Sequence, residues 1–531
     1  MGKAGNRQSL CSRLSILPRI RHVREPREWV FGLPREGRTL LLEAGVGATL
    51  FPMSSHSIDQ LRERLPEKVF ESDSPEWESA RQVFSPSGRL KRPTAVVRPA
   101  DREEVAVFVR WANETATRFA VRSGGHSFDG FSVQEGTVLL DLRALNRLEL
   151  DAEQRLSAMP AATVLGVSEH LMGTGRALPC GDCPTVGLGG LVSGGGFGYA
   201  GRSFGLTIDA LEELTMVCGD GSLVTASATE NPDLFWAGRG GGGCAGIVTD
   251  MRFRTYPIEN VTGVTMGWEW GAAAEAVVLH SQLMRESSTK LDLKLKFRTT
   301  GPDRFMDATS AGPADCIPGE PLVHVDGQYL GEQDEARDLL RPFLEHPAAR
   351  QVSVRRESYH DAVLQLVPLD ILRDPSPRTL RPIRIASDFV RGELGFREGE
   401  AIVRSIEVLQ SHPKLCGGGL LLEPSDGALH SVPVSATAFP HRNADLLLEW
   451  EFFHDLPLVP DIRRIQDEVL AEVRAALGKR LTGGRYLNYP GLEDTPEDWW
   501  GENLSRLQTI TQRHDPNGVI LSRLNPAGNL P

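Results

Sequence analysis

Two glycine-rich stretches decide the fold: Arg122-Ser123-Gly124-Gly125-His126-Ser127, and Cys183-Pro184-Thr185-Val186-Gly187-Leu188-Gly189-Gly190, which continues into Ser193-Gly194-Gly195-Gly196-Phe197-Gly198. Each stretch places one nucleophilic side chain, His126 or Cys183, inside a loop. Glycine lets backbone N–H groups approach a phosphate closely. A nucleophile in such a loop can also form a bond to the group that the loop holds. Together the two stretches favour a flavin nucleotide held at two covalent points.

The residues around the first stretch predict a small α/β unit. A β-type run at 95–99 ends at proline, and residues 100–115 have helical spacing with Asp101 as a plausible N-cap. Residues 119–122 read as a second strand, which delivers the first glycine loop, and residues 137–142 as a third. The order β-α-β-loop-β places that loop at the carboxyl end of a strand.

A second group of elements surrounds the Cys183 stretch. Residues 156–161 read as a strand and residues 163–175 as a helix. Residues 211–217 and 222–225 read as a hairpin around Asp220-Gly221, because Asp-Gly is a strong turn signal. Residues 247–256 read as a further strand.

From about residue 258, long helical patterns alternate with strand patterns. Helices are expected over 272–285, 334–344, 398–409 and 461–477, and strands over 291–297, 322–328, 420–423 and 445–452. The strand 291–297 alternates strictly between apolar and charged side chains. That alternation predicts a sheet face in contact with water, within an antiparallel sheet covered by helices.

Motifs in one order along the chain carry a family resemblance. Residues 122–129, 183–198, 233–249 and 486–490 together resemble the berberine-bridge-enzyme-like family, which comprises FAD-linked oxidoreductases of the vanillyl-alcohol-oxidase superfamily. The resemblance is strong over residues 89–257 and 480–528. Cys244-Ala245 departs from the family's Asn-Phe, and Leu191 replaces a common histidine.

The resemblance implies a cofactor, FAD, and the residues that bind it. His126 matches the histidine that bonds the flavin 8α carbon, and Cys183 matches the cysteine that bonds flavin C6. Two such bonds withdraw electron density from the flavin and fix it in place. The further residues expected to contact FAD are Arg122, Ser123, Gly124, Gly125, Ser127, Thr185, Val186, Gly187, Gly189, Gly190, Gly195, Gly196, Gly198, Gly246, Ile247, Val248 and Asn488.

The resemblance also implies a general base in Tyr486-Leu487-Asn488-Tyr489-Pro490. A tyrosine there takes the proton of a substrate hydroxyl while hydride moves to flavin N5. Tyr489 is the first candidate and Tyr486 the second; either one has to be stabilised as a phenolate, because the ordinary pKa of tyrosine is about 10. The alternative is that both tyrosines only pack a domain interface.

The expected fold class is α+β. It comprises a PCMH-type FAD-binding domain of two subdomains, formed by N- and C-terminal segments, and an inserted substrate domain with an antiparallel sheet covered by helices. The expected boundaries are 1–88 for an N-terminal extension that is partly disordered, 89–257 for the FAD domain, 258–478 for the substrate domain, and 479–531 for a berberine-bridge-type segment returning to the FAD domain.

Composition excludes several other classes of protein. The net charge of −12 argues against a nucleic-acid partner. No apolar run reaches the roughly 20 residues that span a bilayer, so no membrane partner and a cytoplasmic location are expected. The cysteine count is 7, without a disulfide framework. Cys180-Gly181-Asp182-Cys183 could form a disulfide, but no second pair follows at metal-ligand spacing, so no metal is expected.

The sequence therefore predicts an FAD-dependent oxidoreductase that oxidises an alcohol, a sugar or a secondary metabolite, at a C–H bond beside a hydroxyl or an amine. The expected partners are a small-molecule substrate and O2 as electron acceptor. Two alternatives stay open: an oxidative cyclase or dehydrogenase of a biosynthetic pathway, and a flavoprotein without catalytic activity.

Overall fold

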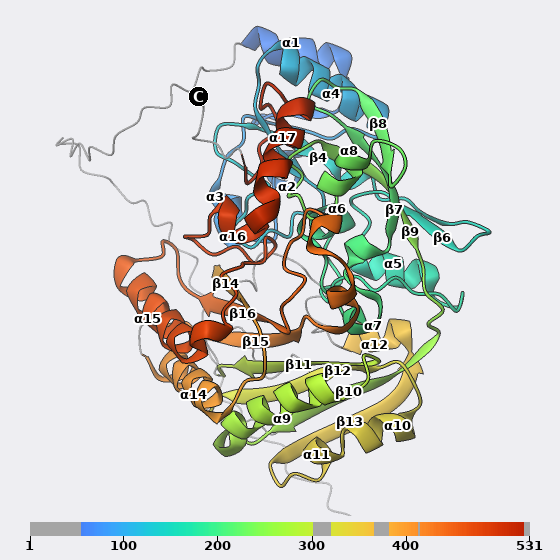
Figure 1. The fold of residues 1–531 in the computed structure, drawn as a ribbon. Coiled ribbons are helices and arrows are strands. Elements are labelled where there is room, and N and C mark those ends of the chain that lie inside the picture. Colours follow the sequence, from blue (N-terminus) through green and yellow to red (C-terminus); the bar gives the residue numbers. More distant parts are fainter. Residues whose placement is uncertain (1–54, 301–319, 366–381, 413–414, 525–531) are drawn as a thin grey trace, which may run out of the picture. The chain divides into compact units, whose positions relative to one another are not determined.

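The computed structural model describes residues 55–300, 320–365, 382–412 and 415–524. These residues form three β-sheets with helices packed on them (Figure 1). The two smaller sheets come from residues before 258 and the largest from residues after it. The mixture of separate helices and mainly antiparallel sheets confirms the α+β class. Over the described ranges, no helix combines the length and the apolar character needed to cross a bilayer.

The first sheet carries the first glycine loop at the end of a strand. Its order is β1-β2-β4-β3, with β2, β4 and β3 parallel and β1 antiparallel at the edge. Asp101 caps α4 by accepting a hydrogen bond from the Glu104 N–H at 2.8 Å, as predicted. The bounds are β1 Val69–Phe70, β2 Ala95–Val97, α4 Arg102–Glu114, β3 Phe119–Arg122 and β4 Val138–Asp141.

The described part of the predicted N-terminal extension packs on this first sheet. It contains α1 (Ser55–Arg64), α2 (Trp77–Ala80) and α3 (Pro86–Leu90). Leu61 of α1 is fully buried in the same apolar cluster as Phe108 of α4. The Phe84 N–H donates to the Gly125 carbonyl at 2.9 Å. Residues from 55 onward therefore contribute both core contacts and a contact to the first glycine loop.

The second sheet is antiparallel, in the order β5-β6-β9-β7-β8. It packs with the helices that precede and follow the Cys183 loop. The predicted hairpin is confirmed as β7 and β8. The Cys183 loop leads directly into α6, whose first residue follows Gly187. The bounds are β5 Leu148–Leu150, β6 Arg155–Ala158, α5 Val164–Leu171, α6 Leu188–Gly194, α7 Gly201–Phe204, β7 Leu211–Val217, β8 Leu223–Ser227, α8 Pro232–Ala237 and β9 Ile247–Arg254.

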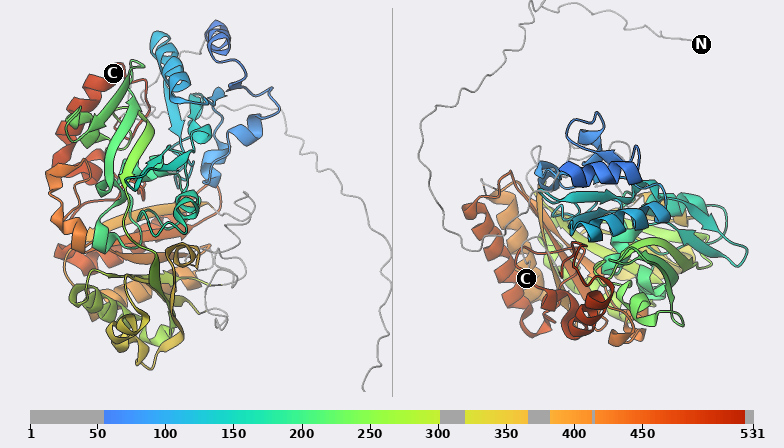
Figure 2. Two further views of the ribbon diagram at one scale, coloured as in Figure 1. Left: turned by 90° about the vertical axis from the view of Figure 1, so that its right-hand side faces the viewer. Right: turned by 90° about the horizontal axis from the view of Figure 1, so that it is seen from above.

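The third sheet is antiparallel, in the order β13-β10-β12-β11-β15-β16-β14. Its helices α9, α14 and α15 share one apolar core with the sheet (Figures 1 and 2). The bounds of its strands and helices are β10 Asn260–Trp268, α9 Ala273–Glu286, β11 Leu291–Arg298, β12 Leu322–Tyr329, α10 Gln333–Leu339, α11 Arg341–Leu344, β13 Ala349–Ser358, α12 Tyr359–Gln365, β14 Ile383–Val390, α14 Phe396–Ser411, β15 Gly418–Pro424, β16 Leu446–Phe453 and α15 Pro460–Leu477.

The two faces of this sheet differ in chemistry, and one expectation about them is wrong. The odd-numbered residues of β11 lie in the helix-covered core, as the alternation predicts. The other face of β11 is not open to water: Asp292 and Lys294 are each only 3% exposed. That face is covered by the glycine-rich loops and by the segment around residue 489. The alternation marks two different buried environments.

The C-terminal segment returns to the first two sheets. The Phe119 N–H donates to the Val519 carbonyl at 3.0 Å, so residues near 520 run alongside β3. The helices α16 (Pro496–Trp500) and α17 (Leu504–His514) precede this contact, and Trp500 of α16 donates to the Gly240 carbonyl at 3.0 Å. The chain between 260 and 477 is thus inserted between two parts of one packed unit.

Candidate functional site

A cavity of about 530 Å³ lies between the glycine-rich loops and the polar face of the seven-stranded sheet. It brings together most of the residues that the sequence selected. The predicted residues that line it are Ser123, Gly124, Gly125, His126, Ser127, Cys183, Val186, Gly187, Gly189, Gly190, Gly246, Ile247, Val248, Tyr486, Asn488 and Tyr489. Of the residues that depart from the family pattern, Leu191 lines the cavity, whereas Cys244 is buried outside the lining.

The two glycine stretches touch each other across the sequence. A Cβ atom on Gly124 would lie 2.5 Å from the Gly187 nitrogen, and one on Gly187 would lie 2.6 Å from the Gly124 nitrogen. No real side chain fits at those distances, so the contact requires glycine at both positions. The approach places His126 and Cys183 on the same wall of the cavity.

The two nucleophiles are neighbours. Cys183 Sγ lies 3.4 Å from His126 Nε2, and Thr185 Oγ1 lies 3.1 Å from the same nitrogen. Burial raises the pKa of the Cys183 thiol, but the charge of His126 and hydrogen bonds from His126 and Thr185 outweigh burial, so the pKa is lowered. A lowered thiol pKa increases the nucleophilic thiolate fraction. Cys180 differs: it is a free thiol, and burial raises its pKa to about 12.

Phe84, which the sequence did not select, orients His126. The two rings stack with centroids 3.9 Å apart and planes 19° from parallel. Phe84 also lines the cavity. No local pattern could have selected it, because its contact with His126 depends on how residues 55–92 dock on the first sheet.

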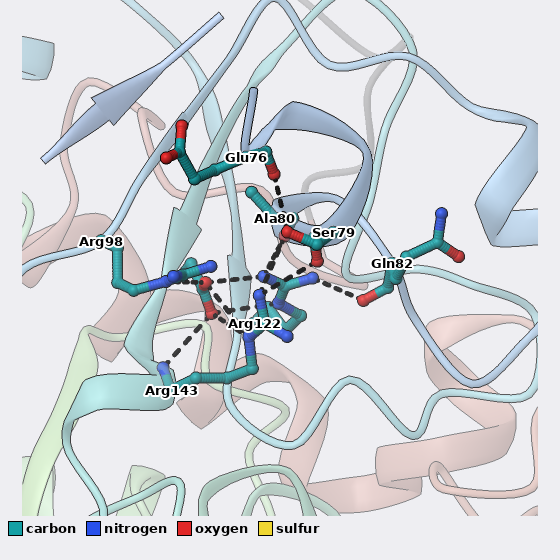
Figure 3. A network of polar contacts seen from close by, with 8 residues as sticks. Glu76, Ser79, Ala80, Gln82, Arg98, Arg122 and Arg143 are labelled. Carbon is teal, nitrogen blue, oxygen red and sulfur yellow. Dashed lines mark hydrogen bonds and ion pairs between the residues drawn. The ribbon is translucent and has the colours of Figure 1, made fainter. Parts of the chain in front are cut away.

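Arg122 does not line the cavity. Its side chain is fully buried and forms an ion pair with Asp141 at 2.7 Å (Figure 3). Its guanidinium also donates to the carbonyls of Gln82, at 2.6 Å, and Ala80. Arg122 therefore ties the segment before Phe84 to the strands that carry the first loop.

The other predicted residues outside the lining support it from behind. Thr185 contacts both nucleophiles. Gly196 has φ +91°, and its N–H donates to the Tyr486 hydroxyl at 3.0 Å. A Cβ on Gly198 would lie 2.8 Å from the Cys180 carbonyl carbon, and one on Gly195 would meet the Phe439 ring at 3.3 Å. These glycines allow close packing rather than direct contact with the cavity.

The two tyrosines have different surroundings. The Tyr486 hydroxyl accepts hydrogen bonds from Gly196 N–H and Asn488 Nδ2, both at 3.0 Å, and burial raises its pKa to about 12. Tyr489 packs edge-on against Tyr486 with ring centroids 4.9 Å apart. Burial and the charges of Glu423, Glu449 and Asp182 raise the pKa of Tyr489 well above its ordinary value.

The sheet side of the cavity is charged, and sequence analysis did not select its residues. Lys296 pairs with Asp326 at 2.9 Å, and Arg298 pairs with Glu451 at 2.8 Å. Deeper in the same face, Lys294 forms ion pairs with both Asp182 and Glu423. The charged residues of the sheet that line the cavity are Lys296, Arg298, Asp326, Glu449 and Glu451, together with His324. The charged residues that alternate with apolar ones in β11 were the sequence feature that could have identified this side of the cavity.

The described residues contain no group of three or more His, Cys, Asp or Glu side chains placed to hold a metal ion. Within the same ranges, Cys180 and Cys183 are both free thiols rather than a disulfide.

Comparisons with known proteins agree with this geometry. A family model described as an FAD binding domain matches residues 93–227. A xylooligosaccharide oxidase from Thermothelomyces thermophilus is 35% identical over 519 residues, covering 91% of this chain and 97% of that protein. Among solved structures, a glucooligosaccharide oxidase from Acremonium strictum has a TM-score of 0.74 at 24% identity, covering 87% of this chain and 97% of that one. The BBE-like 1 protein of Physcomitrella patens has a TM-score of 0.74 at 21% identity, covering 89% of this chain and 100% of that one.

The relative at 35% identity spans nearly the whole of both chains, and the solved structures have the same fold. The sequence motifs, the shared cavity and these matches lead to one assignment. The chain belongs to the berberine-bridge-enzyme-like family and is an FAD-linked oxidoreductase.

Proposed function

We propose that His126 and Cys183 hold FAD through two covalent bonds. The supporting observation is that their reactive atoms lie 3.4 Å apart and that both residues line the cavity, so both can reach one edge of one ring. The lowered pKa of Cys183 favours the thiolate that such a bond requires. The glucooligosaccharide oxidase structure contains a 6-S-cysteinyl, 8α-N1-histidyl FAD.

The surrounding residues fit a flavin dinucleotide. The loop 123–127, in which only His126 has a large side chain, offers backbone N–H groups to a pyrophosphate. Ile247 and Val248 line the cavity together with Ile520 and Leu521, which gives an apolar site for an adenine. When bound, FAD would supply the acceptor for a hydride from a substrate carbon.

The proposed reaction is oxidation of a sugar or related alcohol at a C–H bond beside a hydroxyl, with O2 as the final acceptor and H2O2 as product. The charged sheet face supplies donors and acceptors for several hydroxyl groups. The relatives named as oligosaccharide oxidases support a carbohydrate substrate. Oxidative cyclisation or dehydrogenation without O2 is the alternative.

Tyr489 is the proposed proton acceptor, but as a relay rather than as a standing phenolate. Burial and the nearby carboxylates raise the pKa of Tyr489, which keeps its phenol protonated. A substrate hydroxyl can pass its proton to the Tyr489 oxygen while Tyr489 passes its own proton to Glu423 or Glu449. Tyr486 suits the role less well, because its oxygen already accepts two hydrogen bonds.

Acid precipitation of the purified protein tests the covalent bonds. Yellow colour should stay in the pellet of the wild type and of His126→Ala and Cys183→Ala, and leave it in the double variant. Cys180→Ala is the matched control, since that thiol is buried outside the lining of this cavity. Release of colour from the wild type would refute both covalent bonds.

Substrate oxidation tests the reaction and the base. Neutral oligosaccharides should bleach the flavin without oxygen and produce H2O2 in air. Tyr489→Phe should lower kcat by about 10²–10⁴-fold while substrate still binds. Full activity of that variant would refute the relay. Flavin that no sugar or alcohol bleaches would favour a flavoprotein without catalytic activity.

A further inference from the structure

Glu449 is a buried carboxylate that faces the cavity without a partner. It lies on β16, on the face opposite the helix-covered core, and its side chain lines the cavity. The residue is 4% exposed. No hydrogen bond or ion pair joins its carboxylate to any residue in the described part of the chain. A buried unpaired carboxylate is strongly disfavoured, so this position calls for a partner.

The neighbouring cations do not supply that partner. Arg298 is engaged by Glu451 at 2.8 Å, and Lys296 by Asp326 at 2.9 Å. Lys294 is held between Asp182 and Glu423. These lysine and arginine side chains on this face of the described sheet therefore form ion pairs with other carboxylates, and none of them pairs with Glu449.

The unpaired carboxylate and its neighbours change one another's pKa values. Burial raises the pKa of Glu449 well above its ordinary value, and the negative charges of Glu451 and Glu423 raise it further, against the opposing effects of Arg298 and Lys294. The carboxylates of Glu423 and Glu449 also raise the pKa of Tyr489. Excess negative charge thus surrounds the group proposed to handle the substrate's proton.

We propose that the cavity is built for a substrate that carries a protonated amine, such as an amino sugar, and that Glu449 is the carboxylate that binds this ammonium group. This inference rests on the proposed oxidation of a sugar or alcohol and names its substrate class. An ammonium group at Glu449 would satisfy the unpaired carboxylate with a charge-assisted hydrogen bond. It would also offset the negative charge around Tyr489.

A matched series of β-1,4-linked dimers tests the proposal on the flavin-loaded protein. The glucosamine dimer, the N-acetylglucosamine dimer and cellobiose differ in the group at C2: an ammonium, a neutral amide or a hydroxyl. Isothermal titration calorimetry without oxygen, at neutral pH and low salt and with the flavin reduced beforehand by dithionite so that no turnover occurs, gives a Kd for each. The glucosamine dimer should bind at least about tenfold more tightly than the two neutral dimers.

Glu449→Gln removes the charge and keeps the size of the side chain. It should bring the three Kd values to within about twofold of one another, through weaker binding of the glucosamine dimer alone. Glu398→Gln is the control: Glu398 is 5% exposed and outside the cavity lining, so its substitution should leave the preference unchanged. Retained flavin absorbance in both variants shows that they fold.

The outcomes separate this inference from the proposed reaction. Equal affinities in the wild type, no binding of the glucosamine dimer, or an unchanged preference in Glu449→Gln would each overturn the ammonium site. If the amine preference depends on Glu449 but no dimer bleaches the flavin, the ammonium site stands and the proposed oxidation of these sugars falls. If all three dimers bleach the flavin with equal affinity, the reaction stands and the ammonium site falls.

Discussion

Replacing Arg122 by methionine should release the segment before Phe84 without unfolding the protein. The methionine keeps much of the side-chain volume but removes the guanidinium from a fully buried ion pair with Asp141. It also removes the donors to the carbonyls of Ala80 and Gln82. These contacts join residues 76–84 to the strands that carry the first glycine loop (Figure 3).

The free-energy cost of Arg122→Met depends on which contacts Asp141 and the two carbonyls keep in the variant. Removing one partner of a buried ion pair costs about 3–5 kcal/mol. Asp141 keeps Arg98 at 2.7 Å and Arg143 at 3.1 Å, so the lower end of that range applies. The Ala80 carbonyl keeps Arg143 as a donor at 3.1 Å, so only the loss of the donor to the Gln82 carbonyl adds about 1 kcal/mol. A loss of about 4 kcal/mol corresponds to about a thousandfold increase in the undocked population. Folding free energies of about 5–15 kcal/mol leave the chain folded after such a loss.

Hydrogen exchange measured by mass spectrometry checks this number. The peptide that covers residues 76–90 should exchange about a thousandfold faster in Arg122→Met than in the wild type. Arg143→Met is the control: Arg143 also reaches Asp141 and the Ala80 carbonyl, each at 3.1 Å, but its side chain is 37% exposed. Its exposed ion pair should cost about 1 kcal/mol or less. Equal exchange in Arg122→Met and Arg143→Met would refute the assigned role of Arg122.

Three further variants test other contacts. Tyr486→Phe removes the oxygen that accepts two buried N–H groups, so stability should fall by about 1–3 kcal/mol, seen as a lower melting temperature; an unchanged melting temperature would contradict those bonds. Gly124→Ala should separate the two glycine loops and reduce acid-stable flavin, whereas Gly271→Ala, with nothing within 4 Å of its Cβ, should not. Burial lowers the pKa of His280 to about 4, so the unfolded chain, with a pKa of about 6.5, binds the proton first and stability falls as pH drops from about 6.5 to about 4. His280→Gln should flatten that loss in a series of melting temperatures, and an unchanged slope would show that other groups cause it.

Short stretches of sequence predicted the helix caps and turns, because these depend on residues that are close together in the chain. The cap at Asp101 and the hairpin of β7 and β8 followed from short stretches of sequence. The nucleophiles His126 and Cys183 could be selected because each stands in a glycine-rich loop that matches a motif of the family. The helix predicted over 334–344 is divided into α10 and α11, since Pro342 cannot continue the hydrogen bonding of α10.

The rest of the site depends on long-range contacts. Phe84 reaches His126 because Arg122 holds the preceding segment and the Phe84 N–H bonds to the Gly125 carbonyl. Glu449 stands in a run of apolar residues, and nothing local shows that its face of β16 meets the cavity. The charged half of β11 looked solvent-exposed, because alternation reports two different environments without saying that one of them is water.

The two-faced strand β11 also constrains how the protein can change. Its odd residues belong to the domain core, and its even residues supply the charges beside the cavity. Substitutions at even positions can alter ligand preference while the core stays intact. Insertion of a single residue would exchange the two sets, placing lysines in the core and leucines beside the ligand. Point substitutions along this strand can therefore change ligand preference, whereas insertion or deletion of a single residue would disrupt the core.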